Sequence, residues 1–336
     1  MKGVIDVLCD KLQLSKDSLS FADITNHTLH IPPKRKRVWK VELKVNGTTL
    51  YLMLFPVHHH QFPGIKQLQY VIEVLKSLKL RFSDFPKILG YFRAEDDRVL
   101  YDVAVFQKVE ADLIQNYFDD CSTENHQKIF VSLKALGRAL AELHMKKAVY
   151  RRSPHKRFLE FYDFWINDFK EKFNQLHLQH EAGFYLEKLH QCHLESFSIP
   201  FLTGVIHLDA GPQNLMYDPE KGKIVFLDLE GISLSINKKM EGEGPVSLDF
   251  VKTYHFFIEK LRRNGLPKKA IDFFVESYRL FSGKHFPNES HLVYFLMLEL
   301  IKDLCLLQRN GMAGTRIADR KKKRFEKLFS EGKFWI

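Results

Sequence analysis

The hydrophobic pattern of the chain changes period near residue 110, and this change limits the folds that the chain can adopt. Upstream, apolar and polar residues alternate in short runs, which predicts strands, and one longer run repeats at helical spacing. The predicted strands are residues 39–45, 48–55, 87–92 and 98–109, and the predicted helix between the two pairs is residues 64–80. Asn46-Gly47 predicts a hairpin turn between the first two strands.

Downstream of residue 110, apolar residues recur at helical spacing through most of the chain. The predicted helical segments are residues 129–144, 157–194 and 248–329, the last of them interrupted at 264–267 and near Pro287. In the first segment, Gly137 would let a neighbouring helix approach closely. The predicted fold class is therefore α+β with two lobes: a small antiparallel-sheet lobe with one helix at residues 1–110, and a larger, mostly helical lobe at residues 111–336.

A chain of 336 residues that is 45% hydrophobic can bury one large core or two smaller ones, which predicts a folded globular protein. The four cysteines are far apart and form no C-x-x-C pair, which favours reduced thiols over a disulfide framework or a zinc site. The N-terminus lacks an uninterrupted apolar signal segment, and no run reaches the roughly 18 apolar residues of a membrane span. These observations predict a cytoplasmic protein.

The formal net charge is +10, and two basic clusters contribute to it. They are residues 34–37, KRKR, and residues 320–324, RKKKR. Such clusters attract nucleotides, phosphorylated sugars, acidic membranes or nucleic acid. No nucleic-acid-binding motif accompanies them, so nucleic acid is not an expected partner. Two interpretations stay open: an acidic membrane surface as partner, with the protein peripheral to its inner face, and a solvated basic face for residues 320–324.

Four polar residues follow apolar runs in the segment 205–231, which begins VIHLDAGPQN and ends VFLDLEG. They are His207, Asp209, Asn214 and Asp228. Phosphoryl transfer from a nucleotide needs a carboxylate beside the attacking hydroxyl and hard oxygen ligands for Mg²⁺. A loop over 207–214, followed by a hairpin that returns to Asp228, would place such oxygens around one cleft. The joint spacing therefore favours a phosphoryl-transfer site over polar residues that only cap strand ends.

The motifs H-L-D-A-G-P-Q-N and F-L-D-L-E-G resemble the H-x-D-x-x-x-x-N and I-D-F/W-E signatures of the aminoglycoside phosphotransferase and choline kinase families, which share the protein-kinase-like fold. Residues 135–144, ALGRALAELH, resemble the helix that precedes the loop in these families. Residues 247–250, SLDF, resemble the Asp-Leu text that follows the metal-binding aspartate. Glu230 matches a glutamate of the choline kinase branch, and its role stays open. The resemblance spans about residues 20–300.

The resemblance implies a role for each matched residue. Asp209 would be the catalytic carboxylate that accepts or orients the proton of the substrate hydroxyl. Asn214 and Asp228 would bind Mg²⁺. His207 would brace the loop through hydrogen bonds, and Asp249 would tie the loop to the helical lobe.

Two features of these families are missing from the chain. Their third strand carries a lysine in text such as V-L-K-L-F-P, whereas this chain has Y-L-M-L-F-P with Met53, and the following helix has an apolar residue where the lysine's glutamate partner should stand. Losing both together avoids an unpaired buried charge. The loop PPKRKR also lacks the glycine that would let its backbone approach phosphate.

Other cations could bind the phosphates instead. The candidates are Lys34, Arg35, Lys36 and Arg37, with Lys40 and Lys44 of the following strand as alternatives. The segment Phe106–Glu110 would be the hinge whose backbone receives adenine, with Phe106 and Lys108 as nucleotide-binding residues.

Motifs and resemblance together predict a phosphotransferase that uses ATP and Mg²⁺ and acts on a hydroxyl of a small-molecule or saccharide acceptor. A sugar kinase of the lipopolysaccharide type stays open within this class. A pseudokinase-like binding module also stays open, because Met53 and the glycine-free loop favour it. His58-His59-His60 is interpreted as a solvated loop, since no carboxylate or cysteine is spaced to complete a metal site. The aromatic residues of 158–184 are interpreted mainly as core.

Overall fold

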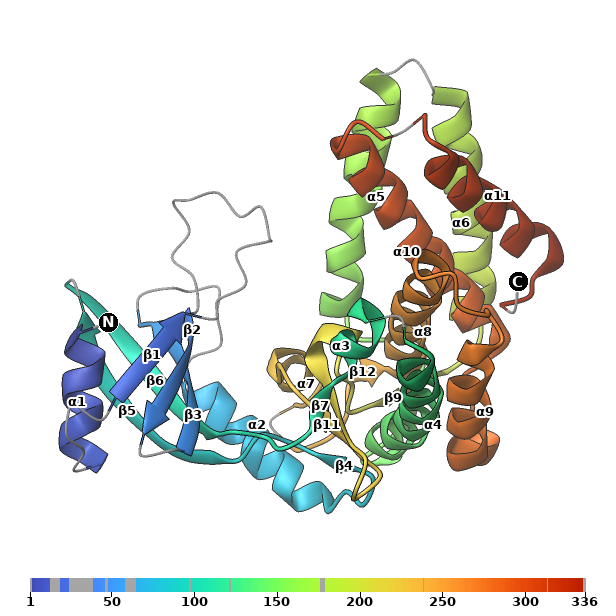
Figure 1. Cartoon of the computed structure of the whole chain (residues 1–336). Coiled ribbons are helices and arrows are strands. Elements are labelled where there is room, and N and C mark those ends of the chain that lie inside the picture. Colours follow the sequence, from blue (N-terminus) through green and yellow to red (C-terminus); the bar gives the residue numbers. More distant parts are fainter. Residues whose placement is uncertain are drawn as a thin grey trace.

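The computed structural model has two lobes, a sheet with two helices beside it and a larger body of helices (Figure 1). It describes residues 2–12, 19–23, 39–45, 48–57, 65–96, 98–120, 122–175, 179–237, 239–312 and 314–334. The predicted α+β, two-lobed fold class is confirmed.

The sheet of the first lobe is antiparallel, with the strand order β1-β2-β3-β6-β5. Its strands are β1 (Leu19–Asp23), β2 (Trp39–Val45), β3 (Thr48–Pro56), β5 (Ile88–Asp96) and β6 (Val99–Gln107). The last four confirm the strands predicted from alternation, while β1 was not predicted. The predicted turn at Asn46-Gly47 lies outside the described residues.

Two helices accompany this sheet, α1 (Lys2–Leu12) and α2 (Ile65–Leu78). Only α2 was predicted. Because side chains alternate along a strand, the two faces of β3 meet different partners. Leu52 and Leu54 lie in a buried core with Leu8 of α1. Met53 lies in a separate cluster with Phe106 and with Leu68 of α2.

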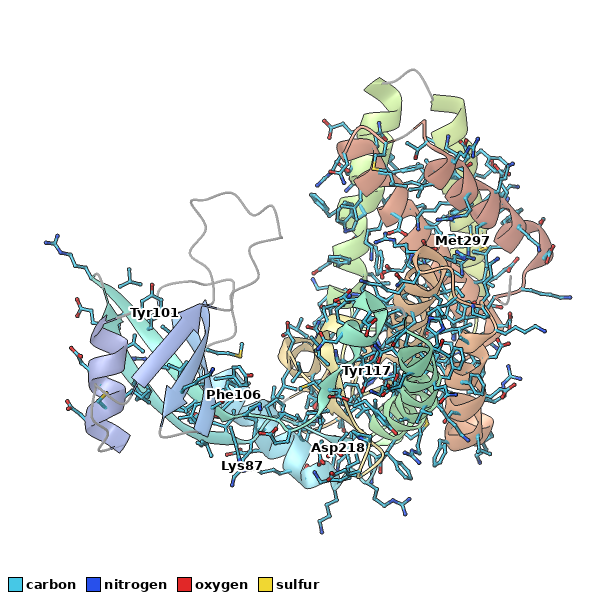
Figure 2. The ribbon with its side chains drawn as sticks, in the orientation of Figure 1. Lys87, Tyr101, Phe106, Tyr117, Asp218 and Met297 are labelled. Carbon is cyan, nitrogen blue, oxygen red and sulfur yellow. The ribbon has the colours of Figure 1, made fainter. Side chains whose placement is uncertain are left out.

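The second lobe contains the predicted helical segments, including the interruptions near 264–267 and Pro287. Its helices are α3 (Ile114–Asp119), α4 (Thr123–Met145), α5 (Arg157–Gln175), α6 (Gln179–Phe197), α7 (Glu230–Leu234), α8 (Val246–Arg263), α9 (Ala270–Ser282), α10 (Glu289–Arg309) and α11 (Arg316–Glu331), with 3₁₀ turns η2 (Pro212–Asn214) and η3 (Gly283–His285). The long helix α10 contacts α5, α6, α8 and α11 (Figure 1). Met297 of α10 is fully buried among these helices (Figure 2).

Helices α4 and α9 approach closely at Gly137. A Cβ atom at this position would lie 2.2 Å from the backbone oxygen of Phe274 and 2.9 Å from the backbone nitrogen of Tyr278. The close approach predicted from this glycine is therefore confirmed, and only glycine fits the contact.

One small sheet contains part of the segment 205–231, and a second small sheet lies next to that segment in the chain. One has the order β4-β11-β10-β7 and contains β4 (Ser83–Asp84), β7 (Asp112–Leu113), β10 (Leu215–Asp218) and β11 (Lys223–Phe226). The other has the order β12-β9-β8 and contains β8 (Val149–Arg151), β9 (Phe201–Gly204) and β12 (Gly244–Pro245). The predicted hairpin that returns to Asp228 is the pair β10–β11. β4 precedes residue 110 in the chain but pairs with β11 of the second lobe. The division of the chain into two lobes at residue 110 therefore stays a prediction.

The basic cluster at 320–324 is only partly a surface feature. Lys321 and Arg324 are buried on the inner side of α11. The Lys321 ammonium lies 2.5 Å from Asp303 and 3.4 Å from Glu259, and the Arg324 guanidinium lies 3.7 Å from Glu259. The interpretation as a solvated basic face is wrong for these two residues, because they belong to a buried network of ion pairs.

The aromatic residues of α5 divide between the core and the surface. Phe158, Tyr162 and Phe169 are buried, as predicted, whereas Phe161 and Phe164 are about half exposed. The side chains of Cys9, Cys192 and Cys305 are buried. Cys121 and the predicted histidine loop at 58–60 lie outside the described residues. Among the helices that the structure describes, none combines the length and apolar composition needed to cross a bilayer.

Candidate active site

Asp249 of α8 holds the backbone of the segment 205–231. Its two carboxylate oxygens accept hydrogen bonds from the backbone N–H groups of His207 and Leu208, each at 2.7 Å. Oδ2 also lies 2.9 Å from Nε2 of His144. Leu208 has φ +69°, a strained value for leucine, which these bonds help to maintain. The predicted tie between Asp249 and the loop is therefore confirmed.

Asp249 is ionised although it is fully buried. Burial by itself would raise its pKa, but the hydrogen bond and charge of His144 and the proximity of His207 outweigh burial, so that the pKa lies below its ordinary value. A second contact orients His144, because the Tyr278 hydroxyl lies 2.7 Å from Nδ1. The anchor of the loop is thus itself held by two helices, α4 and α9.

His207 uses both ring nitrogens within the loop. Nε2 donates to the backbone oxygen of Leu227 at 2.7 Å, and Nδ1 accepts from the backbone N–H of Asp209 at 3.3 Å; the tautomer follows from these partners. The side chain is fully buried. His207 therefore braces the loop, as predicted, and has no free nitrogen for proton transfer.

Asp209 and Asn214 form a direct pair across the turn η2. Nδ2 of Asn214 donates to Oδ2 of Asp209 at 2.7 Å and to the backbone oxygen of Asp209 at 3.0 Å. Burial raises the pKa of Asp209, and the negative charge of Asp228 acts in the same direction, whereas Lys252 and His207 oppose the increase. A carboxylate whose pKa is raised by burial is suited to accept a proton near neutral pH.

Leu227 connects the pair to Asp228. The backbone N–H of Leu227 donates to the backbone oxygen of Asn214 at 2.9 Å, and its carbonyl accepts the bond from His207. Asp228 follows with φ +53°, a left-handed conformation that aspartate tolerates better than most residues. The backbone thus brings Asp209, Asn214 and Asp228 together from positions 19 residues apart in the chain.

Gly231 permits this arrangement. A Cβ atom here would lie 1.8 Å from the backbone oxygen of His207, so no other residue fits without movement of the loop. The glycine at the end of the VFLDLEG motif is therefore a packing requirement of the loop.

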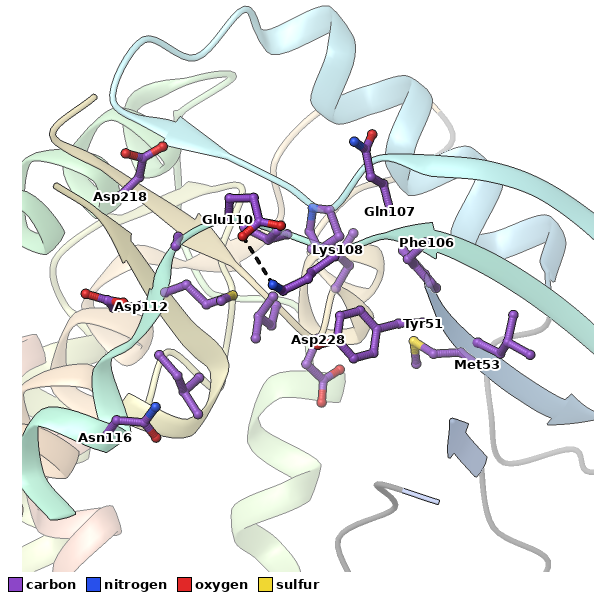
Figure 3. Close-up of a pocket in the computed structure, with 18 of the residues that line it drawn as sticks. Tyr51, Met53, Phe106, Gln107, Lys108, Glu110, Asp112, Asn116, Asp218 and Asp228 are labelled. Atoms are coloured by element: carbon purple, nitrogen blue, oxygen red, sulfur yellow. Dashed lines mark hydrogen bonds and ion pairs between the residues drawn. The ribbon is translucent and has the colours of Figure 1, made fainter. Parts of the chain in front are cut away.

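A cavity of about 820 Å³ lies between the two lobes, beside this constellation. Tyr51, Met53 and Phe106 line it from the sheet, and Asp228 lines it from the segment 205–231 (Figure 3). The predicted hinge 106–110 forms one wall. The cavity combines apolar and aromatic side chains with carboxylates, a lining typical of a small-molecule site.

Met53 and Leu68 both line this cavity. Met53 stands where the families that the sequence resembles have a lysine paired with a glutamate. Met53 and Leu68 belong to one apolar cluster with Phe106. The loss of both charges is thus compensated by packing, and no charge is stranded.

The described lining of the cavity is rich in carboxylates. They are Glu110, Asp112, Asp218, Glu220 and Asp228. Lys108 is the one cation among the described lining residues, and its ammonium lies 3.2 Å from Glu110 (Figure 3). The predicted phosphate-binding residues Lys34, Arg35, Lys36 and Arg37 lie outside the described residues. Lys44 is exposed and is not part of the lining.

The donor set fits Mg²⁺. Asn214 uses its NH₂ group on Asp209, so its Oδ1 oxygen takes no hydrogen bond among the described residues, and Asp228 adds a carboxylate. Mg²⁺ needs only one or two protein oxygens when phosphates and waters complete its octahedron. No cluster of three or more His, Cys, Asp or Glu suited to a metal occurs in the described part of the chain. The chemistry therefore favours a metal bound together with a nucleotide.

Sequence reasoning missed Lys252, Asp112 and Asn116. Lys252 lies one helical turn beyond Asp249, and that spacing is a signal that could have identified it. Asp112 and Asn116 line the cavity at the start of α3, and no local pattern marks them.

No known protein-family model and no curated protein matches the chain. Solved structures do match. Spectinomycin phosphotransferase, crystallised with ADP and spectinomycin, aligns with 98% of this chain and 95% of its own at a TM-score of 0.51 and 13% identity. A glucosamine kinase bound to glucosamine, ADP and inorganic phosphate aligns with 97% of this chain and 82% of its own, at a TM-score of 0.55 and 11% sequence identity. A Plasmodium vivax ethanolamine kinase aligns with 97% of this chain and 88% of its own, at a TM-score of 0.51 and 13% sequence identity.

These likenesses establish the fold. The chain has the protein-kinase-like fold of the aminoglycoside phosphotransferase and choline kinase type, as the motifs predicted. At sequence identities of 11–13%, these alignments do not establish an activity for this chain, because one fold hosts many functions.

Proposed function

We propose that the chain is a phosphotransferase that uses ATP and Mg²⁺ and phosphorylates a hydroxyl group of a small-molecule or saccharide acceptor. The observation that carries this proposal is the hydrogen-bonded pair Asp209–Asn214, joined to Asp228 through the backbone of Leu227, at the edge of a cavity between the lobes. The ADP found in the spectinomycin phosphotransferase and glucosamine kinase structures supports an adenine nucleotide, although a GDP complex of an aminoglycoside 2'-phosphotransferase has the same fold.

In the proposed reaction, the acceptor oxygen forms a bond to the γ-phosphorus while the bond to the β–γ bridging oxygen breaks. ADP leaves, and the hydroxyl proton goes to the carboxylate of Asp209. Asn214 and Asp228 would hold Mg²⁺, which neutralises charge on the transferring phosphoryl group. The backbone of residues 106–110 would receive the base, with Phe106 against it.

The missing third-strand lysine needs a substitute, and Lys40 is the candidate that the register favours. The backbone register of β2 and β3 pairs position 40 with position 53. We expect Lys40→Met to weaken MgATP binding. Lys44→Met is the matched control, because Lys44 is exposed on the same strand outside the cavity lining.

A binding module that transfers nothing is the second candidate, and the apolar cluster against which Met53 and Leu68 pack favours it. Retention of Asp209, Asn214 and Asp228 favours transfer. The two candidates differ in one outcome, since both bind a nucleotide but only an enzyme releases ADP from MgATP.

The deciding experiment is a thermal shift with ATP, with and without Mg²⁺, on the wild type and on Asp228→Ala, followed by an assay of ADP release. Ligand at one hundred times its dissociation constant stabilises a protein by about 2.7 kcal/mol. A magnesium-dependent shift that Asp228→Ala loses, together with ADP release, supports the phosphotransferase. A shift without ADP release supports the binding module, and no shift with any nucleotide contradicts both.

A further inference from the structure

A second cavity, of about 840 Å³, lies where α2 meets the segment 79–91. Residues of α2 form one wall, and the linker after α2 forms the other together with the start of β5. Among the described residues, Pro86 is the only one that lines both this cavity and the cavity between the lobes. The second cavity is therefore a separate site, and its volume is within the range of small-molecule sites, about 300–1,000 Å³.

Three lysines line the second cavity: Lys76, Lys79 and Lys87. All three are exposed, and within the described part of the chain none of their ammonium groups makes a hydrogen bond or an ion pair. The carboxylates of the described lining are Glu73 and Asp84, and Asp84 already accepts a hydrogen bond from Lys223 at 3.1 Å. With Lys223 included, four ammonium groups stand against two carboxylates, an excess of two positive charges.

The cavity between the lobes has the opposite charge. Its described lining carries five carboxylates, and the ammonium of Lys108 is paired with Glu110 at 3.2 Å. Because like charges repel, that cavity disfavours an anion that no metal accompanies. The second cavity, with its excess of ammonium groups, attracts such an anion.

The second cavity also offers apolar surface and a neutral hydrogen-bond donor. Its lining includes the apolar residues Leu75, Leu80, Phe85 and Ile88. Burial, reinforced by the charge of Glu73, raises the pKa of Tyr91 to about 12, so the hydroxyl of Tyr91 stays protonated at neutral pH. A ligand can thus pack its carbon skeleton against apolar residues while its charged groups contact the lysines.

We infer that the second cavity binds a small organic anion with two or more carboxylate or phosphate groups. The inference does not rest on the proposed function, because none of the described residues of the segment 205–231 lines the second cavity. The excess of two positive charges matches a ligand with at least two negative charges. An ammonium group binds carboxylate and phosphate alike as a point charge, and the concave form of the site favours a small molecule over a flat acidic membrane.

Isothermal titration calorimetry without Mg²⁺ or nucleotide tests the inference. Citrate is the carboxylate probe, fructose 1,6-bisphosphate is the phosphate probe, and fructose is the neutral control. At least one of the two anions should bind, whereas fructose should not, and the tighter anion identifies the group that the site prefers. The cavity variant combines Lys76→Glu, Lys79→Glu and Lys87→Glu. It should bind the anion at least about tenfold more weakly, because it replaces the charged hydrogen-bond donors by like charges.

A second triple variant is the matched control. It combines Lys268→Glu, Lys269→Glu and Lys284→Glu, three exposed lysines that do not line the second cavity. Its net charge changes by the same amount, and it should keep the wild-type affinity. If the cavity variant does not fold, the same three lysines changed to glutamine remove the positive charges without adding negative ones, and binding should again weaken by at least about tenfold.

Three results would overturn the inference. One is that neither anion binds. Another is that the cavity variant and the control weaken binding equally, which would show an attraction to net charge alone. The third is that phosphatidylserine vesicles bind the wild type but not the cavity variant while neither free anion binds, which would assign the lysines to a membrane surface.

Discussion

Asn214 donates a hydrogen bond from Nδ2 to Oδ2 of Asp209 at 2.7 Å, across a single 3₁₀ turn. The bond occupies one carboxylate oxygen and leaves the other for an incoming hydroxyl. It also turns the amide so that Oδ1 remains for a cation. One contact therefore serves the two chemical roles that the proposed reaction requires.

Replacement of Asp209 tests the first role. Asp209→Asn keeps the shape of the side chain but cannot accept a proton, so kcat for MgATP turnover should fall by about 10²–10⁴-fold. The melting temperature should stay close to that of the wild type, because the loop is held by Asp249. Turnover at the wild-type rate would exclude Asp209 as the base.

Asp249→Asn should destabilise the protein by about 3–5 kcal/mol, because it leaves a buried network of hydrogen bonds without its charge. Urea denaturation at pH 7 measures this cost. The control is Asp163→Ala on α5, an exposed aspartate for which a change below about 0.5 kcal/mol is expected. Equal effects of the two changes would contradict the anchoring role.

The destabilisation caused by Asp249→Asn should depend on pH in a predictable way. The pKa of Asp249 is lower in the folded protein than in the unfolded chain. Its contribution to stability is therefore present above the unfolded pKa, about 3.9, and is lost as the pH falls through the folded value. The difference in unfolding free energy between wild type and Asp249→Asn should shrink as the pH is lowered below about 4. A constant difference would show that the charge of Asp249 contributes nothing.

Met53 and Leu68 should behave as a coupled pair. Met53→Lys alone places an ammonium in an apolar cluster and should cost about 1–3 kcal/mol, and Leu68→Glu should have a similar cost. The double change restores an ion pair, so the two costs should not add; we expect a favourable coupling of at least about 1 kcal/mol. A double-mutant cycle by urea unfolding measures the coupling, and strict additivity would show that the side chains do not face each other.

Gly137→Ala should destabilise the contact between α4 and α9 by about 2 kcal/mol or more, because its Cβ would lie 2.2 Å from the backbone oxygen of Phe274. Gly183→Ala in α6 is a matched control, since a Cβ there meets nothing within 4 Å. That change should stabilise the helix by up to about 1 kcal/mol. Similar melting temperatures for the two variants would contradict the close helix approach.

Much of the architecture follows from local patterns. Alternation predicted β2, β3, β5 and β6, and helical spacing predicted α2 and the longer helices of the second lobe, but not α3 or α7. The motif spacing also brought Asp209, Asn214 and Asp228 into one hypothesis before any contact was known. The helix α1 was not predicted, because its apolar residues are explained only by the sheet against which they pack.

Interpretations that depended on which way a side chain faces were less successful. Lys321 and Arg324 resembled surface charges, but their partners Glu259 and Asp303 come from two other helices. Phe161 resembled core, yet it is half exposed next to Lys252.

The sequence by itself determined the change from a strand-rich to a mostly helical part of the chain, the strands β2, β3, β5 and β6, and the identity of the loop that carries Asp209, because periodicity and motif spacing are local properties of the chain. The tertiary structure alone decided that Met53 and Leu68 pack against one apolar cluster with Phe106, and that Asp249 holds the loop. These relationships join residues 15 and 42 positions apart in the chain, and packing and burial at such separations cannot be read from the chemical nature of a residue alone.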